Sequence, residues 1–190
     1  ARFCATTASM CGVESAGFEQ NDEKMSQAIV KDVMLHAYMF TQSGIPMLYS
    51  GDEIGQVNDY TYKDDPEKAP DSRYIHRGKF CWELVEKIKE KDSVQGRIFG
   101  SISDLEKIRR NEAVFDADAE VYTKDYSDPS ILWIVRKTDK EELHAVFNFS
   151  DADKTVWMPE VTEYTDLMTG KKENVEKTVL PAWDFLWMKK

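Results

Sequence analysis

The chain has 190 residues, 42% of them hydrophobic and 12% aromatic, so it can bury a core and is not disordered as a whole. Its 35 acidic and 25 basic side chains give a net charge of −10, which repels phosphate backbones and argues against nucleic acid as a partner. No apolar run approaches the roughly 18 residues that a membrane-spanning helix needs, so we also expect no membrane partner.

The number and spacing of the cysteines bear on the compartment in which the chain is found. Cys4, Cys11 and Cys81 are odd in number and lack CxxC spacing, so a disulfide framework is not expected and a reducing, cytoplasmic compartment is favoured. The small and apolar neighbours of Cys4 and Cys11 favour buried structural thiols over reactive ones. The first ten residues lack the apolar region of a signal peptide and an initiator Met, so the chain is either processed or part of a longer protein.

The first predicted elements are a long helix and a short strand. Asn21 is a suitable N-cap, acidic residues follow it, and the apolar positions up to Phe40 have helical spacing. His36 lies in the apolar half of this helix and is expected to be a core histidine rather than a metal ligand. After Gly44, the apolar run Ile45–Tyr49 predicts a fully buried strand of the parallel kind. This order of elements is typical of α/β proteins.

A loop of nearly thirty polar, charged and aromatic residues follows that strand, and loops of this length are usually functional or disordered. Two more helices are predicted after it, at Trp82–Lys91 and Val94–Asn111. The second has an apolar stripe with three- and four-residue spacing, and its charged side is expected to face solvent.

Beyond Asn111 the hydrophobic period changes from that of a helix to that of a strand. Short segments rich in β-branched and aromatic residues are separated by turn signals, which predicts an antiparallel β-sandwich. We therefore expect two domains, 1–113 and 114–190. The first contains one predicted strand, and because one strand cannot form a sheet, its partners would lie outside this chain. The segments are AEVYTKDY, ILWIVRKT, LHAVFNFS, TVWMPE, EYTDLMTG, ENVEKTVL and WDFLWMKK.

The segment that begins at Gly44 carries a distinctive motif. It reads G-x-P-x-x-Y-x-G-D-E and is formed by Gly44, Pro46, Tyr49, Gly51, Asp52 and Glu53. This motif resembles the eighth barrel strand of the α-amylase family of glycoside hydrolases. The start of the chain, RFCATTASMCG, is similar to the family's R-x-S-G-T-A-A-x-x-x-G stretch between strands seven and eight, with Cys4 and Ala5 in place of Ser and Gly.

The continuation NDYTYKDDPEKAPDSRYIHR resembles a narrower group, the amylosucrases and their sucrose-acting relatives. That group carries an N-D-Y-like turn, then D-P-x-K-A, then D-S-R-W-x-H-R. Tyr74 stands where the group has Trp. The matching residues are Asn58, Asp59, Asp65, Pro66, Lys68, Ala69, Asp71, Ser72, Arg73, His76 and Arg77.

The resemblance implies an α/β fragment, made of the last strand and helices of a TIM-type (β/α)8 barrel, followed by the β-sandwich domain. The implied parent is a retaining enzyme that hydrolyses or transglucosylates sucrose or α-glucans. Such enzymes use a carboxylate nucleophile and a carboxylic acid roughly 5 Å apart. In the family these groups lie upstream of Ala1, so we expect no catalytic residue, no cofactor and no activity in this chain alone. Its partners would be the sugar substrate and the missing N-terminal barrel.

The long loop is where substrate-binding residues are expected, because active sites of such barrels lie at the C-terminal face. By resemblance, Arg73 pairs with an upstream Asp at the bottom of the glucosyl pocket, and Arg2 contacts the acceptor side. Asp59 and Tyr60 suit sugar hydroxyls and the C–H face of a pyranose. The alternative for Arg73 is a surface ion pair with a neighbouring aspartate, Asp71 or Asp64.

Four further loop residues are interpreted as structural. Asp52 and Glu53 form an apparent carboxylate pair, but adjacent side chains point apart, so they are expected to fix the loop by hydrogen bonds. His76 and Arg77 are assigned the same role, with substrate contact as the alternative. The acidic residues of the loop lack the glycine and terminal glutamate of an EF-hand, so no metal site is expected.

Two other function classes remain open. Trp133, Trp157, Trp183 and Trp187 lie on predicted strands, where core packing is the usual fate of tryptophan, although a non-catalytic carbohydrate-binding module would also use them. A purely structural β domain is the other alternative. The apolar helix segment Val33–Phe40 would expose a patch if its barrel partners were absent, so the chain is expected to self-associate.

Overall fold

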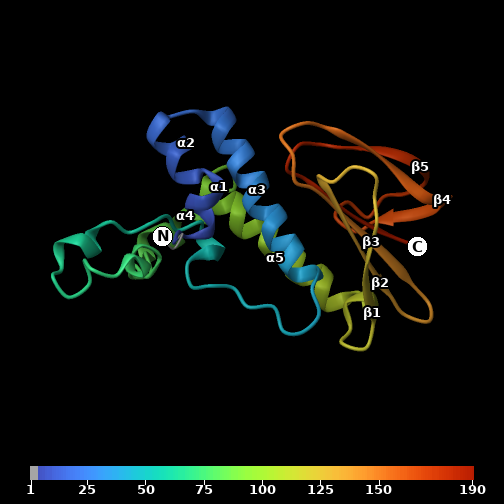
Figure 1. The fold of residues 1–190 in the computed structure, drawn as a ribbon, viewed down its shortest axis with the longest axis horizontal. Coiled ribbons are helices and arrows are strands. Elements are labelled where there is room, and N and C mark those ends of the chain that lie inside the picture. Colours follow the sequence, from blue (N-terminus) through green and yellow to red (C-terminus); the bar gives the residue numbers. More distant parts are fainter. Residues whose placement is uncertain (1–3) are drawn as a thin grey trace. The chain divides into compact units, whose positions relative to one another are not determined.

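The structure, a computed structural model, describes residues 4–190. The chain divides into two compact units (Figure 1). The first comprises the residues up to Val33 together with Met47–Ile102, and the second comprises Met34–Pro46 with Ser103–Lys190. The predicted domain division at residues 113 and 114 remains a prediction. No helix in the described part of the chain combines the length and the apolar character that a membrane crossing requires.

The first unit opens with two short helices, α1 (Thr7–Cys11) and α2 (Val13–Glu19). The Thr6 hydroxyl caps α1 by accepting from the Ser9 amide at 3.2 Å. Gly12, with φ of 106°, ends α1 and begins α2, a backbone conformation that L-residues with a Cβ rarely adopt. Helix α3 (Asp22–Thr41) follows, and Asn21 Oδ1 accepts from the Lys24 amide at 2.9 Å, as predicted for its N-cap.

The predicted strand at Ile45–Tyr49 is wrong. The segment has no β pairing, and Ile45, Met47 and Tyr49 are 90%, 80% and 50% exposed. Within the described part of the chain, the strands all belong to one sheet formed after residue 119. Because a strand is stabilised by hydrogen bonds to a neighbour, an apolar run without one stays extended and open to water.

The long loop, residues 50–81, is built from three 3-10 turns and leads into two helices. Helix α4 (Trp82–Lys87) is shorter than predicted because the Ser93 hydroxyl donates to the carbonyl of Lys87 at 2.7 Å. The same hydroxyl accepts from the Gly96 amide at 2.9 Å and so caps α5 (Val94–Asn111), which has its predicted bounds. The three 3-10 turns are η1 (Asp52–Ile54), η2 (Thr61–Asp64) and η3 (Ser72–His76).

The second unit contains a six-stranded antiparallel sheet with the order β1-β2-β3-β6-β4-β5. The predicted antiparallel strands are thus confirmed, although two of them, TVWMPE and EYTDLMTG, merge into β4. The register of β4 against β5 shifts between Trp157 and Thr162, so the chain passes Pro159 by a bulge rather than a turn. The strands are β1 (Glu120–Lys124), β2 (Ile131–Lys137), β3 (Glu142–Asn148), β4 (Lys154–Asp166), β5 (Lys172–Leu180) and β6 (Phe185–Lys189).

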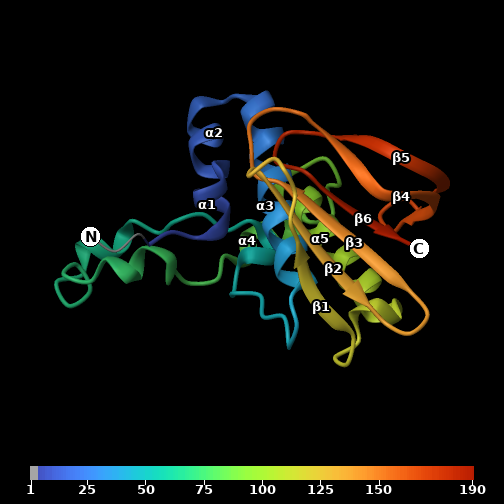
Figure 2. The ribbon, with the colours of Figure 1, turned by 45° about the vertical axis from the view of Figure 1, so that its right-hand side comes forward.

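The predicted sandwich is one continuous sheet folded over itself rather than two separate sheets. In both views the β4–β5 hairpin bends over the other strands (Figures 1 and 2). Among the described residues, β6 pairs with β4 only at Thr165 and Asp166, which leaves room for that bend. The enclosed core consists of Ile131, Trp133, Val135, Val146, Val156, Met158, Tyr164, Val175, Leu180 and Met188.

A side chain closes the unpaired edge of β4. The Tyr126 hydroxyl, in the β1–β2 connection, accepts from the Trp157 amide at 3.1 Å and donates to the Thr155 carbonyl at 3.3 Å. Lys154 at the start of β4 binds Asp128 of the same connection at 2.8 Å. These contacts hold the connection against β4 where no strand covers it.

Two arginines of the second unit, one on the sheet and one on α5, bind the C-terminal end of α3. Arg136 on β2 is fully buried and donates to the carbonyls of Val114 (2.7 Å), Thr41 (3.0 Å) and Asp116 (3.0 Å). Arg109 on α5 donates to the Phe40 carbonyl and, at 3.0 Å, to that of Gly44. The carbonyls of Phe40 and Thr41 are in the last turn of α3 and lack intrahelical partners, so these guanidiniums supply donors to groups that would otherwise be left unbonded.

His144 is buried inside the folded sheet among charged groups. Its Nδ1 accepts from Trp133 Nε1 at 3.1 Å, so the proton sits on Nε2, which lies 3.0 Å from Glu142. Burial lowers the pKa of His144 to about 4, although the Glu142 carboxylate opposes this effect. Lys190 and Lys124 also disfavour a charged imidazole, whereas Glu160 favours it.

We expect the second unit to lose stability as the pH falls from about 6.5 towards 4. The folded-state pKa of His144 lies below its ordinary value, so the unfolded chain binds the extra proton in this window and unfolding is favoured. At pH 4.5 the loss should be about 2 kcal/mol relative to pH 7. Urea unfolding at the two pH values measures it.

The variant His144→Gln is the control for this effect, because its amide accepts from Trp133 and carries no charge at either pH. Carboxylates titrate in both proteins, so the difference between their pH responses isolates His144. An equal loss of stability in wild type and variant would assign the pH dependence to other groups.

Candidate functional site

Asn58 joins the long loop to the helices at the start of the chain. Its Oδ1 accepts from the Thr6 amide at 2.9 Å, and its Nδ2 donates to Glu14 at 3.1 Å. Its backbone amide donates to the Ser9 hydroxyl at 2.9 Å. Two segments that are far apart in sequence are therefore fastened at one residue.

Asp59 and Tyr60, two of the predicted sugar-binding residues, follow this joint directly. The Asp59 carboxylate accepts from the amide and the hydroxyl of Thr61 at 2.9 and 2.7 Å, and these bonds lower its pKa. A Cβ on Gly78 would lie 2.7 Å from that of Asp59, so the two arms of the loop pass too closely for a larger residue. Tyr60 is 48% exposed, with Lys63 Nζ 5.5 Å from its ring centre.

Arg73 begins the second arm of the loop and binds Asp71, two residues before it. Its Nε lies 2.8 Å from Oδ1 and its Nη2 lies 2.6 Å from Oδ2. The hydrogen bonds from Arg73 lower the pKa of Asp71 to about 2 and, in turn, raise that of Arg73. The Arg73 side chain remains 47% exposed, and this contact is the ion pair given above as the alternative interpretation.

Asp52 and Glu53 lie at the first turn of the loop, η1. Asp52 Oδ2 accepts from the Tyr49 amide at 3.3 Å, and Glu53 Oε2 accepts from the Gly51 amide at 3.0 Å. Gly51 has φ of 98°, and a Cβ there would lie 2.9 Å from that of Gln56. Both carboxylates therefore bind the backbone of the turn that contains them.

His76 and Arg77 end η3 and contact aromatic rings. The His76 ring lies 5.9 Å from that of Tyr49, edge to face, and the Arg77 guanidinium lies 5.9 Å from the Tyr74 ring. Gln56 ties the end of the loop to its beginning, because it donates to the Lys79 carbonyl and accepts from the Cys81 amide, both at 3.0 Å. Aromatic contacts and backbone bonds thus close the loop on itself.

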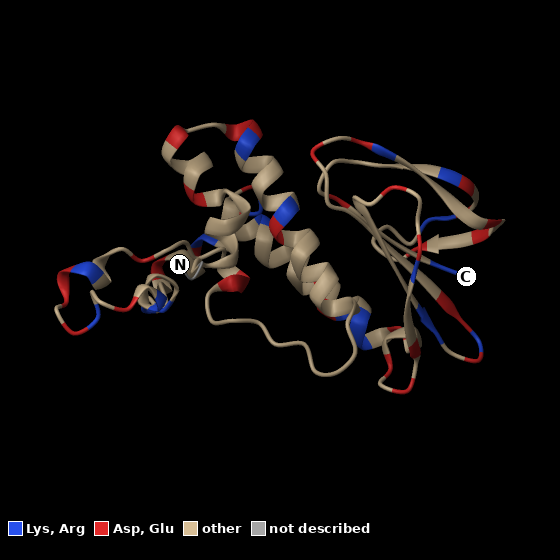
Figure 3. Cartoon of the chain, in the orientation of Figure 1, with Lys and Arg blue, Asp and Glu red and all other residues tan. Residues whose placement is uncertain are grey.

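The structure brings the two arms of the loop together but leaves one predicted residue undescribed. The Asp59 amide donates to the Ile75 carbonyl at 2.7 Å, which places the arm with Asp59 beside the arm with Arg73. Acidic and basic residues are interspersed along both arms (Figure 3). Arg2 lies outside the described residues.

Within residues 4–190, no group of three or more His, Cys, Asp or Glu side chains is arranged to hold a metal ion. Cys11 is buried, and burial with nearby Asp32 raises the pKa of its thiol to about 12, which keeps it protonated and unreactive. His36 is also buried in α3.

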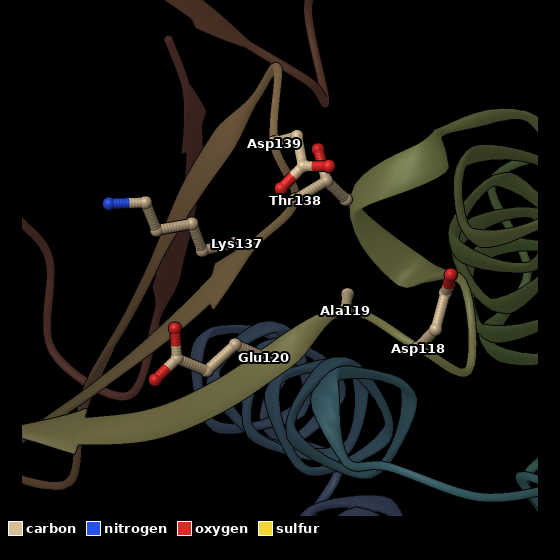
Figure 4. Close-up of a pocket in the computed structure, with 6 residues that line it drawn as sticks. All are labelled: Asp118, Ala119, Glu120, Lys137, Thr138 and Asp139. Atoms are coloured by element: carbon tan, nitrogen blue, oxygen red, sulfur yellow. The ribbon is translucent and has the colours of Figure 1, made fainter.

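A hollow of about 280 Å³ lies in the second unit, and none of the predicted site residues is among the residues that line it. Figure 4 shows that the start of β1 forms one side and the end of β2 the other. It is lined by Asp118, Ala119, Glu120, Lys137, Thr138 and Asp139. It is open and mostly charged, unlike the largely apolar pockets that usually hold small molecules.

The tryptophans considered for a binding module separate into two classes. Trp133 and Trp187 are each 1% exposed or less and pack in the second unit, as expected for core residues. Trp157 is 51% exposed on β4, with Lys177 Nζ 4.9 Å from its ring centre. Trp183 is half-buried.

Asn58 is the residue whose role the sequence did not reveal. It belongs to the motif quoted above, but its partners Thr6, Ser9 and Glu14 lie 44 to 52 positions away. No periodicity or spacing in the sequence connects them. Only the fold brings them together.

Comparison with known proteins finds relatives in the family that the motif at Gly44–Glu53 resembles. No family model matches the chain. Glucosylglycerate phosphorylase of Escherichia coli K12 is 25% identical over 175 residues, which cover 90% of this chain and 30% of that protein. α-Amylase MalA of Haloarcula japonica is 25% identical over 138 residues, which cover 70% of this chain and 17% of that protein. The chain therefore spans less than a third of the length of either relative.

Solved structures share the fold. Maltogenic amylase from S. marinus has a TM-score of 0.57 at 20% identity, over 84% of this chain and 19% of that one. Trehalulose synthase MutB from Pseudomonas mesoacidophila gives 0.61 at 17% identity, over 85% of this chain and 38% of that one. A variant of AmyP in complex with maltotriose gives 0.68 at 14% identity, over 86% and 35%. These relatives and structural neighbours are α-amylase-family glycoside hydrolases.

Proposed function

We propose that this chain is the C-terminal part of a retaining enzyme of the α-amylase family that acts on sucrose or short α-glucans. Relatives with names such as amylase, trehalulose synthase and glucosylglycerate phosphorylase support the substrate class. The share of each relative that the chain covers supports its being one part of a longer enzyme. The observation that carries the proposal is the long loop, which is fixed at its base and presents polar and aromatic side chains.

In this proposal the loop forms one wall of the sugar site. Tyr60 offers a flat apolar face to the C–H groups of a pyranose, and Asp59 and Arg73 offer partners for its hydroxyls. The turn that contains Asp52 and Glu53 holds the wall in place. Ile45–Tyr49, which is exposed in this chain, would pair with a neighbouring barrel strand supplied by the rest of the protein.

The chemistry would be performed by groups outside this chain. A retaining enzyme uses a carboxylate nucleophile and a carboxylic acid roughly 5 Å apart and forms a covalent glycosyl intermediate. Water or a sugar hydroxyl then attacks that intermediate, so hydrolysis and transglucosylation share the first step. The residues between Asn58 and Arg77 favour a sucrose-acting, amylosucrase-like member, and the unpaired cysteines favour a cytoplasmic one.

Self-association of the isolated chain remains part of the proposal, but from a different surface. Met34 and Phe40 are 0% and 3% exposed, and in the helix segment Val33–Phe40 only Tyr38, at 36%, is exposed, while Val33, Leu35 and Met39 are half-buried. The exposed apolar residues Ile45 and Met47 would drive association instead.

We expect the 190-residue chain alone to release neither glucose nor fructose from sucrose, because in this proposal the nucleophile and the acid lie in another part of the protein. The measurement is a coupled assay for both sugars, with the full-length protein as the positive control. Sugar release by the purified chain above the buffer rate would show that its own carboxylates catalyse the reaction.

A non-catalytic carbohydrate-binding module is the second candidate, and the exposed ring of Trp157 favours it. Such a module would be expected to align two exposed tryptophan faces. Trp133 and Trp187 are buried, so neither offers a second exposed ring beside that of Trp157.

A further inference from the structure

Asn58 fixes the base of the long loop by three hydrogen bonds, one through its backbone amide and two through its side chain. The side-chain carbonyl accepts from the Thr6 amide, while the side-chain amide donates to the Glu14 carboxylate. The Thr6 side of the joint is buried, and Asn58 and Glu14 are half-buried. Both functions of the asparagine side chain are therefore used, each toward a partner that requires it.

A short series of contacts connects Asn58 to the predicted sugar-binding residues. Asp59 is the next residue, and its amide donates to the Ile75 carbonyl at 2.7 Å, in the turn that carries Arg73. Gly78 packs closely against Asp59, since a Cβ on Gly78 would lie 2.7 Å from that of Asp59. The path therefore runs from Asn58 through Asp59 to the turn that carries Arg73.

We infer that Asn58 is the positioning residue of the sugar-binding loop and acts through its amide–carboxylate pair with Glu14. This inference rests on the proposed function. Asn58 contacts no reacting atom. It determines the position of the loop that carries Asp59 and Arg73 relative to the bound α-glucoside. A displaced wall weakens sugar binding while the catalytic groups, which lie elsewhere, are unaffected. KM should therefore change more than kcat.

The pair can be broken and then rebuilt with its donor and acceptor exchanged. Asn58→Asp retains an acceptor for the Thr6 amide but faces a second carboxylate, Glu14, about 3 Å away. Adding Glu14→Gln to Asn58→Asp supplies a side-chain amide that donates to the new carboxylate. The double variant thus restores the hydrogen bond in the opposite direction.

The experiment measures kcat, KM for sucrose and Tm in the full-length protein for wild type, Asn58→Asp, Glu14→Gln and the double variant. We expect Asn58→Asp to raise KM about tenfold with kcat within about twofold, and the double variant to recover most of the loss. Glu19→Gln, the same change at an exposed site on α2 that pairs with Lys24, is the matched control.

Each outcome decides a different point. A lower Tm with an unchanged KM would mean that Asn58 serves folding only and would overturn the inference. A double variant as impaired as Asn58→Asp would also overturn it, because the Glu14 pair would then not be the cause. Absence of turnover of any α-glucoside by the wild type would instead count against the proposed function.

Discussion

Replacing Arg73 by alanine in the full-length protein is expected to lower kcat/KM for sucrose at least about tenfold, a loss of about 1.4 kcal/mol in transition-state binding. Asp71 engages Nε and Nη2 of the guanidinium, which leaves the Nη1 donors for a sugar hydroxyl or a second carboxylate. Arg73→Lys should recover only part of the loss, because an ammonium does not reproduce the planar fork. Steady-state sucrose turnover measures the effect.

Two further variants separate this role from a surface ion pair. Arg110→Ala removes an exposed arginine on α5 and should leave kcat/KM within about twofold of wild type. Asp71→Asn removes the observed ion pair; if Arg73 acts on substrate or on a distant carboxylate, the aspartate variant should be impaired less than Arg73→Ala. Turnover by Arg73→Ala within twofold of wild type would make Arg73 an ordinary loop residue.

Arg136→Met should destabilise the second unit by about 3–5 kcal/mol, the largest stability effect we expect from one substitution. Methionine fills much of the same volume, but the carbonyls of Thr41, Val114 and Asp116 lose a buried charged donor. Urea unfolding of the 190-residue chain, followed by the fluorescence of the buried tryptophans, gives the free energy of unfolding.

Lys137→Met is the matched control for this prediction. Lys137 is the next residue on β2, its side chain is 51% exposed, and its ion pair with Glu142 spans 3.4 Å. Its loss should cost less than about 1 kcal/mol. A loss of similar size for Arg136→Met would mean that water or neighbouring donors satisfy the three carbonyls.

Elements that depend on local signals were predicted correctly from the sequence. Predictions that depend on pairing with another strand were wrong. Helix α5 and most strands follow from periodicity and from capping or turn residues such as Ser93. Ile45–Tyr49 has the composition of a buried strand, but composition does not supply a pairing partner. The two predicted strands TVWMPE and EYTDLMTG form one strand because a bulge after Trp157 accommodates Pro159, and this bulge depends on the pairing with β5.

In the candidate site, too, local contacts could be predicted from the sequence and long-range contacts could not. Motif resemblance directed attention to Asp59, Tyr60 and Arg73, and the local contact between Arg73 and Asp71 was among the alternatives that the sequence offered. The bonds that position the loop were not predictable, because Asn58 meets residues more than forty positions away. Long-range polar contacts leave no periodic trace in a sequence.

The Tyr126 hydroxyl at the edge of β4 has a consequence for solubility. An unpaired strand edge is a template on which a second molecule can add a strand and begin an aggregate. One phenol group occupies both a donor and an acceptor of that edge, at Trp157 and Thr155, and so withholds them from an incoming backbone. The chain thus protects with a single side chain an edge that other proteins cover with a helix or a whole strand.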